Sequence, residues 1–279
     1  LSCACGPKRN RECVSPLGPK IEIKGDDRLY DIFSDGSGEA IGLIQHPAIA
    51  GGLFSAPTYS VEHIDEDLDI DYGADLDLDI DGVKGFYRFM IVMADRVYVA
   101  SRVLQKSDKK NLLYLHELSV PNMTLKKSSV PVLTVDYTDG SGKERGNFGY
   151  AVSPDGTKLV LSGFPPEEKG APETEVEMVV LDSELNELWR RKEVLPYRSD
   201  FLAISRNALD NTGRVYLLGI LTTVERKIIR PNDPPNYEYR LFGFYPNKKK
   251  YQDHRIDGQG KFLTSGRLKA MDDGVIFGA

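Results

Sequence analysis

The chain has 279 residues, 41% of them apolar, and a formal net charge of −6. That length and apolar content suit one large domain with a hydrophobic core. Lys and Arg are spread along the chain, so no basic face of the kind that binds nucleic acid is expected. The longest apolar stretch, residues 42–54, is interrupted by His46 and Pro47 and is shorter than the ~18 residues of a transmembrane helix. We therefore expect no nucleic-acid partner and no transmembrane segment.

Residues 1–18 contain Pro, Gly and charged residues without periodicity, which predicts an N-terminal coil or tether before a domain at 19–279. All three cysteines lie in this segment, at Cys3, Cys5 and Cys13. Leu1-Ser2-Cys3 resembles the end of a bacterial lipobox, which would imply acylation of Cys3, a lipid anchor and export. A single disulfide with a leftover thiol, or unmodified thiols, are the alternatives.

Five predicted tight turns recur along the chain at a nearly constant spacing. In chain order they are centred on Gly38, Asp95, Gly156, Gly213 and Gly274, and the intervals are 57, 61, 57 and 61 residues. Each turn joins two apolar strands, and a more polar strand pair follows each of the first four. A fixed period of this length with four strands per repeat predicts the blades of a β-propeller.

The clearest of these hairpins is residues 148–163. Its turn is Ser153-Pro154-Asp155-Gly156, in which Pro154 fixes φ and Gly156 can adopt a positive φ without steric cost. The inner strand pairs are almost continuously apolar, which is typical of strands packed on both faces. The outer pairs alternate and carry charge, as strands at a rim should.

The Ser153-Pro154-Asp155-Gly156 turn between two apolar strands resembles the inner hairpin of TolB-like and WD40-like β-propellers. Residues 179–197 and 209–219 also resemble uncharacterised exported bacterial propeller proteins. The resemblance spans roughly residues 80–279 and implies a propeller fold and export, but no common chemistry. The Gly-His and Trp-Asp pairs of WD40 repeats are missing, which argues against a cytoplasmic WD40 scaffold.

We therefore predict an all-β fold, a β-propeller of four-stranded antiparallel blades with about four and a half repeats. The repeats are expected at residues 26–82, 83–140, 145–197, 198–258 and, in part, 259–279. A β-sandwich with similar strand lengths is the competing fold. Because the last repeat holds one hairpin, we expect a piece of a longer propeller. The alternative is ring closure by a predicted N-terminal strand at residues 20–24.

An acidic segment stands out within the first repeat, where aspartates alternate with apolar residues between Asp67 and Asp81. We expect two strands joined by a turn at Gly73-Ala74, with the carboxylates exposed on one face. Like charges on neighbouring strands are destabilising, so a basic partner segment or a cation is expected to offset them. A solvated rim without a partner is the alternative. The residues predicted to bind a partner here are Asp67, Asp69, Asp71 and Asp75.

The end of this segment, residues 77–82, matches the opening of a D-x-D-x-D-G calcium loop. The candidate metal ligands are Asp77, Asp79 and Asp81. The match is incomplete, because the twelfth position is Arg88 and not the bidentate Glu. Ca²⁺ is the one cofactor that the sequence suggests.

Few other residues indicate a binding or catalytic site. Trp189 is expected on an outer strand, where it either packs the rim or forms a binding hot spot for a partner. The four histidines, His46, His63, His116 and His254, share no metal-ligand spacing. No G-x-S-x-G nucleophile motif and no Gly-rich phosphate loop is present.

These observations predict a non-enzymatic binding or scaffolding propeller of the bacterial cell envelope. It would be exported to the periplasm, the outer membrane or the cell surface and would bind a protein or glycan partner. The alternative is a propeller enzyme of the glycan hydrolase, lyase or lactonase type with its site at the channel mouth. Two or more acidic or His side chains from different repeats at that mouth would favour the enzyme.

Overall fold

The computed structural model describes residues 21, 23, 25–34, 40–47, 57–137, 146–166, 173–222, 236–259, 263 and 265–278. The predicted N-terminal coil, Cys3 and the turn at Gly38 lie outside these residues. Ile21 and Ile23, the described residues of the predicted N-terminal strand, are not part of any strand. Among the described residues, no helix is long and apolar enough to span a membrane.

The described strands form five antiparallel sheets in chain order. The first sheet contains β1 (Arg28–Ser34), β2 (Ala40–His46), β3 (Thr58–Ile64) and β4 (Ile70–Asp75). The second contains β5 (Gly85–Met93), β6 (Arg96–Gln105), β7 (Lys110–Ser119), β8 (Thr124–Lys126) and β9 (Leu133–Asp136). The third contains β10 (Asn147–Val152), β11 (Lys158–Phe164), β12 (Thr174–Asp182) and β13 (Glu187–Leu195). The fourth contains β14 (Leu202–Leu209), β15 (Val215–Thr222), β16 (Tyr237–Phe244) and β17 (Gln252–Ile256), and the hairpin β18 (Arg267–Ala270) and β19 (Val275–Gly278) follows.

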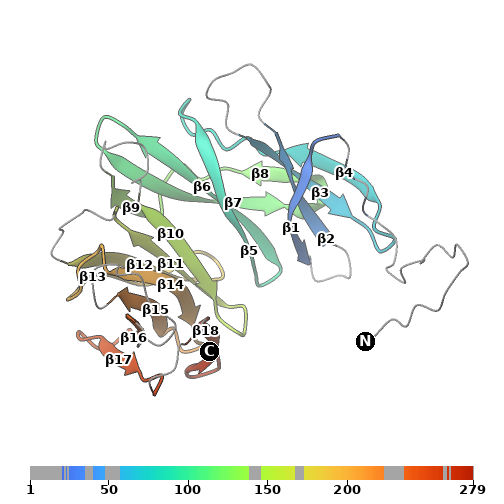
Figure 1. Cartoon of the computed structure of the whole chain (residues 1–279). Helices are drawn as coiled ribbons and strands as arrows, with labels where there is room; N and C mark the ends of the chain where they lie inside the picture. The colour runs from blue at the N-terminus through green and yellow to red at the C-terminus, as the bar shows by residue number, and fades with distance from the viewer. Residues whose placement is uncertain are drawn as a thin grey trace, which may run out of the picture.

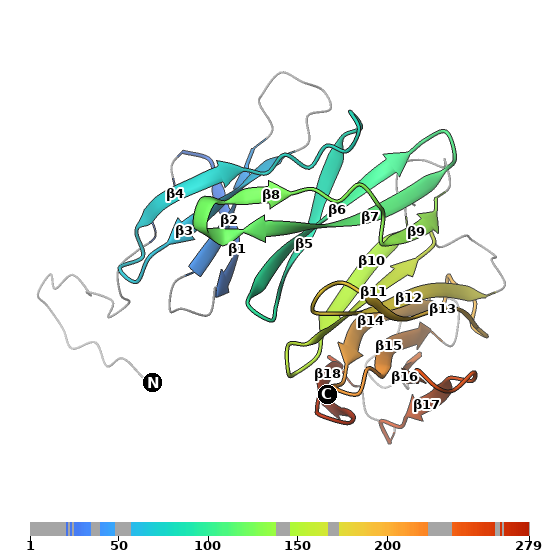
Figure 2. The ribbon, with the colours of Figure 1, turned by 180° about the vertical axis from the view of Figure 1, so that it is seen from behind.

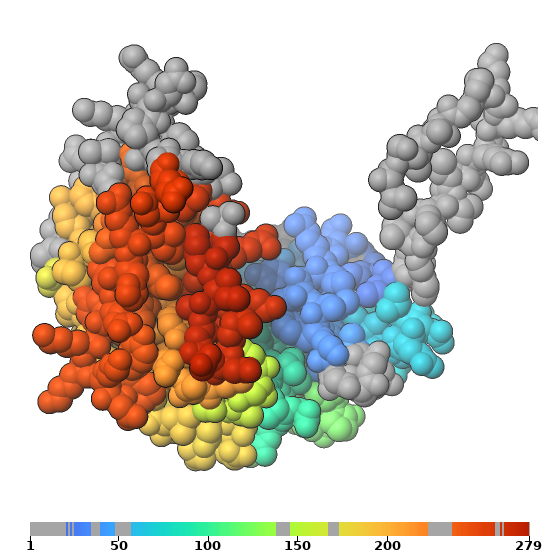
Figure 3. All heavy atoms as spheres, turned by 90° about the horizontal axis from the view of Figure 1, so that it is seen from below, coloured from blue at the N-terminus to red at the C-terminus, as the bar shows by residue number. Residues whose placement is uncertain are grey.

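This arrangement is a β-propeller, and it confirms the predicted fold class. In the first, third and fourth sheets each strand pairs only with its neighbours in sequence. The first strands of successive sheets contact one another, β5 with β10, β10 with β14, and β14 with β18. They therefore form the inner edges of the blades, while the last strands form the rim. Figures 1 and 2 show the sheets following one another around an arc. Figure 3 shows an indentation between the red hairpin β18–β19 and the blue first sheet.

The core lies between adjacent sheets and explains the continuous apolar runs of the inner strands. In β11, Leu159 and Leu161 pack into the cluster shared with the second sheet, whereas Val160 packs into the cluster shared with the fourth. All three side chains are fully buried. Because neighbouring residues of a strand point to opposite faces, a strand between two sheets needs apolar residues at every position. A third cluster, which includes Ile41 and Met90, joins the first two sheets.

The second sheet departs from the four-stranded blade that the repeat predicts. The first half of β7 pairs with β9 and its second half with β8. The short 3₁₀ helix η1 (Val120–Asn122) and Met123, whose φ is +48°, reverse the chain directly after β7. The return strand β8 has only three residues, so β9 completes the outer edge instead.

Positive φ values occur at three of the predicted turns. They are +61° at Asp95, +69° at Gly156 and +83° at Gly213. At Gly156 an added Cβ would meet no atom closer than 3.8 Å. A side chain there is therefore disfavoured by the backbone conformation and not by a clash.

We expect Gly156→Val to lower the free energy of unfolding by about 1 kcal/mol or more, because a β-branched residue tolerates a positive φ poorly. Gly156→Asn is the matched control, since Asn adopts this conformation more readily. Thermal melts of the three proteins measure the effect. Equal destabilisation by Val and Asn would show that the turn conformation is not the cause.

Candidate functional site

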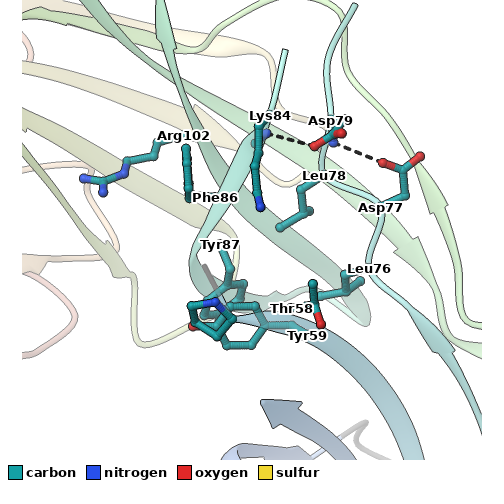
Figure 4. Close-up of a pocket in the computed structure, with 12 residues that line it drawn as sticks. Thr58, Tyr59, Leu76, Asp77, Leu78, Asp79, Lys84, Phe86, Tyr87 and Arg102 are labelled. Atoms are coloured by element: carbon teal, nitrogen blue, oxygen red, sulfur yellow. Dashed lines mark hydrogen bonds between the residues drawn. The ribbon is translucent and has the colours of Figure 1, made fainter. Parts of the chain in front are cut away.

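A pocket of about 400 Å³ lies between the first and second sheets. Its walls come from the start of β3, the segment 76–79 that follows β4, the start of β5, and β6 (Figure 4). The lining residues are Pro57, Thr58, Tyr59, Leu76, Asp77, Leu78, Asp79, Lys84, Gly85, Phe86, Tyr87 and Arg102. The volume falls in the range of small-molecule sites.

Aromatic rings form one side of the pocket. The ring centroids of Tyr59 and Tyr87 are 4.9 Å apart. Phe86 lies between Lys84 and Arg102, whose cationic groups are 5.9 Å and 5.8 Å from its ring centroid (Figure 4). Burial, and secondarily the charge of Asp31, raise the pKa of Tyr87 well above its usual value. Its hydroxyl therefore stays protonated and can donate a hydrogen bond.

Residues 76–79, near the end of the acidic segment, form the opposite side of the pocket. Asp79 accepts a hydrogen bond at Oδ1 from the backbone N–H of Gly85 at 3.1 Å, and Asp77 accepts one at Oδ1 from the N–H of Asp79, also at 3.1 Å. A Cβ at position 85 would lie 1.9 Å from the carbonyl oxygen of Leu78. Only glycine allows the segment to approach β5 this closely.

Lys127 fixes residues 77–79 to the second sheet. Its Nζ lies 2.6 Å from Oδ2 of Asp77 and donates to the carbonyl oxygen of Asp79 at 3.0 Å. The hydrogen bond from Lys127 is the main reason that the pKa of Asp77 lies below its ordinary value. Asp77 is therefore a carboxylate at neutral pH. Sequence reasoning missed Lys127, because it lies about 50 residues downstream and only the pairing of β7 with β8 brings it here.

The predicted turn at Gly73-Ala74 is wrong. Gly73 lies inside β4 and pairs with Glu62 of β3. The reversal occurs earlier, where the carboxylate of Asp65 accepts hydrogen bonds from the backbone N–H groups of Asp67 and Asp69 at 3.0 Å and 2.8 Å. A side-chain cap of this kind makes a turn without glycine.

The predicted binding aspartates are all exposed, but they do not gather in the pocket. Asp67 and Asp69 belong to the turn before β4, and Asp75 ends that strand. At the register shift between β3 and β4, Asp71 contacts Nδ1 of His63 at 2.7 Å. The His63 ring also stacks on Tyr72, with centroids 4.6 Å apart.

The predicted calcium ligands are engaged in other ways or lie in a turn. Asp77 pairs with Lys127, Asp79 accepts from Gly85, and Asp81 has a φ of +49°. In the part of the chain that the structure describes, no three His, Cys, Asp or Glu side chains are grouped to hold a metal ion. Calcium binding stays a prediction.

Trp189 lies on the rim strand β13, away from the pocket. Its Nε1–H donates to the carbonyl oxygen of Gly213 at 3.0 Å, and its ring packs against the core between the third and fourth sheets. The indole therefore links two blades. Its predicted role in partner binding stays a prediction.

In the part of the chain that the structure describes, the first strands of the blades carry few side chains suited to acid–base catalysis. Among the described residues of β1, β5, β10, β14 and β18, the one carboxylate is Asp31, and no histidine is present. A general acid and base drawn from different blades are therefore not found on these strands.

A buried serine–histidine pair in the second sheet has the wrong protonation state for nucleophilic catalysis. Ser101 Oγ lies 2.8 Å from Nε2 of His116, and the backbone N–H of Ser128 donates to Nδ1 at 3.0 Å. Since Nδ1 accepts, Nε2 carries the proton and donates to Ser101. A general base would need a free Nε2. Burial, and secondarily the charge of Lys127, lower the pKa of His116 from 6.5 to about 4.

We expect this histidine to make the fold sensitive to acid. The unfolded chain takes up a proton below pH 6.5 and the folded chain only near pH 4, so the contribution of His116 to stability is lost as the pH falls across that interval. The loss amounts to at most about 3 kcal/mol. Urea unfolding of the protein and of His116→Gln between pH 7 and 4 tests this. Parallel pH profiles would rule out His116 as the source.

No known protein family and no curated protein sequence matches the chain. Two solved structures share weak structural similarity with the chain. A hydrazine synthase of Kuenenia stuttgartiensis has a TM-score of 0.41 and 10% identity, over 88% of this chain and 72% of that one. An oligogalacturonate lyase in complex with manganese has a TM-score of 0.32 and 10% identity, over 85% and 72%. At this level of similarity neither activity is transferred, and the TolB-like resemblance stays a prediction.

Proposed function

We propose that this β-propeller is a non-enzymatic glycan-binding protein and that the pocket between the first two sheets is its binding site. The observation that carries the proposal is the set of aromatic rings of Tyr59, Phe86 and Tyr87 facing a polar wall. A sugar ring has one apolar face of C–H groups and a rim of hydroxyls. It therefore needs a flat apolar surface together with nearby hydrogen-bonding groups.

The polar groups of the pocket suit hydroxyl recognition. The exposed carboxylates of Asp77 and Asp79 accept hydrogen bonds, whereas the exposed ammonium group of Lys84 and the phenol of Tyr87 donate them. Internal bonds hold both carboxylates in place before a ligand arrives. A preorganised site loses less entropy on binding.

Several observations favour binding over catalysis. Asp77 is held ionised by Lys127, so it is unsuited to act as a general acid. The buried pair of Ser101 and His116 has the wrong tautomer for a nucleophile. The described first strands contribute one carboxylate, Asp31, to the inner edges.

Export to the cell envelope belongs to the same proposal. It is supported by the resemblance of Leu1-Ser2-Cys3 to a lipobox, which lies outside the described residues. A lipid anchor at Cys3 would hold a glycan-binding propeller close to the polysaccharides of the envelope or the cell surface.

Affinity electrophoresis in gels that contain soluble polysaccharides tests the binding site. We expect one or more polysaccharides to retard the protein and Tyr87→Ala to abolish the retardation. Lys84→Ala, at an exposed position, should weaken retardation without affecting the fold. Tyr245→Ala is the matched control, because Tyr245 lies outside the pocket, beside Lys248 and Arg214. Equal retardation of the unchanged protein and the three variants would show that glycans bind outside this pocket.

A protein partner is a second candidate, and the acidic segment favours it. The exposed carboxylates of Asp67, Asp69 and Asp75 have no cation within salt-bridge distance among the described residues. They would attract a basic segment of a partner, and the attraction would be screened over ~8 Å at physiological salt.

We expect the triple change of Asp67, Asp69 and Asp75 to Asn to preserve or raise the melting temperature, because it removes repulsion without breaking an internal bond. Asp77 and Asp79 are kept, since their carboxylates hold the pocket wall. Pull-down from envelope extract at low and high salt compares the two proteins. A partner that both retain equally at low salt would exclude the acidic segment as its contact.

A further inference from the structure

The tyrosines of the pocket continue beyond it toward the inner edge of the first sheet. Tyr30 lies on β1 at the register shift between Leu29 and Asp31, and its side chain is 53% exposed. Its ring centroid is 5.6 Å from that of Tyr59 and 5.9 Å from that of Tyr87, both nearly perpendicular. A bulge turns a side chain out of the regular pleat, so Tyr30 extends the aromatic surface outside the pocket.

A second aromatic contact lies at the junction of the second and third sheets. Tyr150 of β10 is 38% exposed, and its ring centroid lies 4.5 Å from that of Phe89 on β5. Burial first, and the charge of Asp31 second, raise the pKa of both Tyr87 and Tyr150, so the exposed Asp31 carboxylate lies within electrostatic range of both phenols. Tyr30 and Asp31 on β1, Tyr87 on β5 and Tyr150 on β10 thus belong to the first strands of three successive blades.

Part of this region is rigidly joined. The guanidinium of Arg88 on β5 donates to Oδ1 of Asn147 on β10 at 2.6 Å. This bond fixes the inner edges of the second and third sheets relative to each other. It is one of the contacts that hold β5, which carries Tyr87, against β10, which carries Tyr150.

We infer that the ligand of the pocket is an extended oligosaccharide, whose chain runs from the pocket across Tyr30 toward Tyr150 and Asp31. The inference rests on the proposed function of the pocket. A single sugar would use only Tyr59, Phe86 and Tyr87 and would leave the two exposed rings without a role. A chain of sugars presents an apolar face at successive units, and a row of exposed rings matches that repetition.

Phenol and carboxylate groups make this path suitable for a glycan in particular. The hydroxyls of Tyr30 and Tyr150 and the carboxylate of Asp31 offer hydrogen bonds along the path. Burial raises the pKa of Tyr150, which keeps its phenol protonated. Exposed aromatic rings with polar edges suit a hydroxylated polymer better than an aliphatic chain.

Calorimetric titration with cello-, manno- and xylo-oligosaccharides of one, two and four units tests the inference on the whole chain. In the series that binds, we expect the tetrasaccharide to bind roughly tenfold more tightly than the disaccharide. Tyr30→Ala and Tyr150→Ala should remove most of this gain and leave disaccharide affinity unchanged. Both side chains are exposed, so the fold should tolerate either change, and Tyr245→Ala serves as the control.

The outcomes separate this inference from the proposed function. Equal affinities for disaccharide and tetrasaccharide would overturn the extended path while leaving the pocket as a site for a short glycan. Loss of disaccharide affinity in Tyr30→Ala or Tyr150→Ala would also overturn it, since the two rings would then belong to the first binding position. Failure of every oligosaccharide to bind would overturn both the path and the pocket.

Discussion

The packing of apolar strands between neighbouring sheets is the constraint on which this structure depends. Leu159, Val160 and Leu161 alternate between two cores, so the third sheet is stabilised only where a sheet lies on each side of it. Burying each such side chain contributes roughly 2 kcal/mol. The polar rim and the inner edges contribute less to this core, which leaves their residues free for binding.

The candidate site lies at a junction of two blades because that junction brings together segments far apart in the chain. The aromatic residues come from β3 and the start of β5, the carboxylates from the segment after β4, and the lysine that holds them from the loop after β8. A loop placed on a rigid sheet scaffold is a common location for binding residues. In this propeller, residues 76–79 form one wall of the pocket. They are held in place by Lys127 and by the close approach that Gly85 permits.

Much of the fold was predictable from local signals, whereas the site was not. The turns at Asp95, Gly156 and Gly213 gave the period, and uninterrupted apolar strands such as β11 indicated burial on both faces. The acidic segment was found, but its turn was misplaced, because the cap formed by Asp65 competes with the more familiar glycine signal at Gly73. The pocket depends on contacts between residues of different strands and sheets, and a single sequence contains no local pattern for such contacts.

Hydrogen–deuterium exchange with and without a polysaccharide that retards the protein shows which segments the ligand covers. We expect slower exchange on binding in residues 76–79 and 84–87 and at the start of β3, which form the pocket walls. Exchange in the rim strands β13 and β17, which lie outside the pocket, should be unchanged. Protection confined to other blades, with the pocket walls unaffected, would contradict the assignment of the binding site.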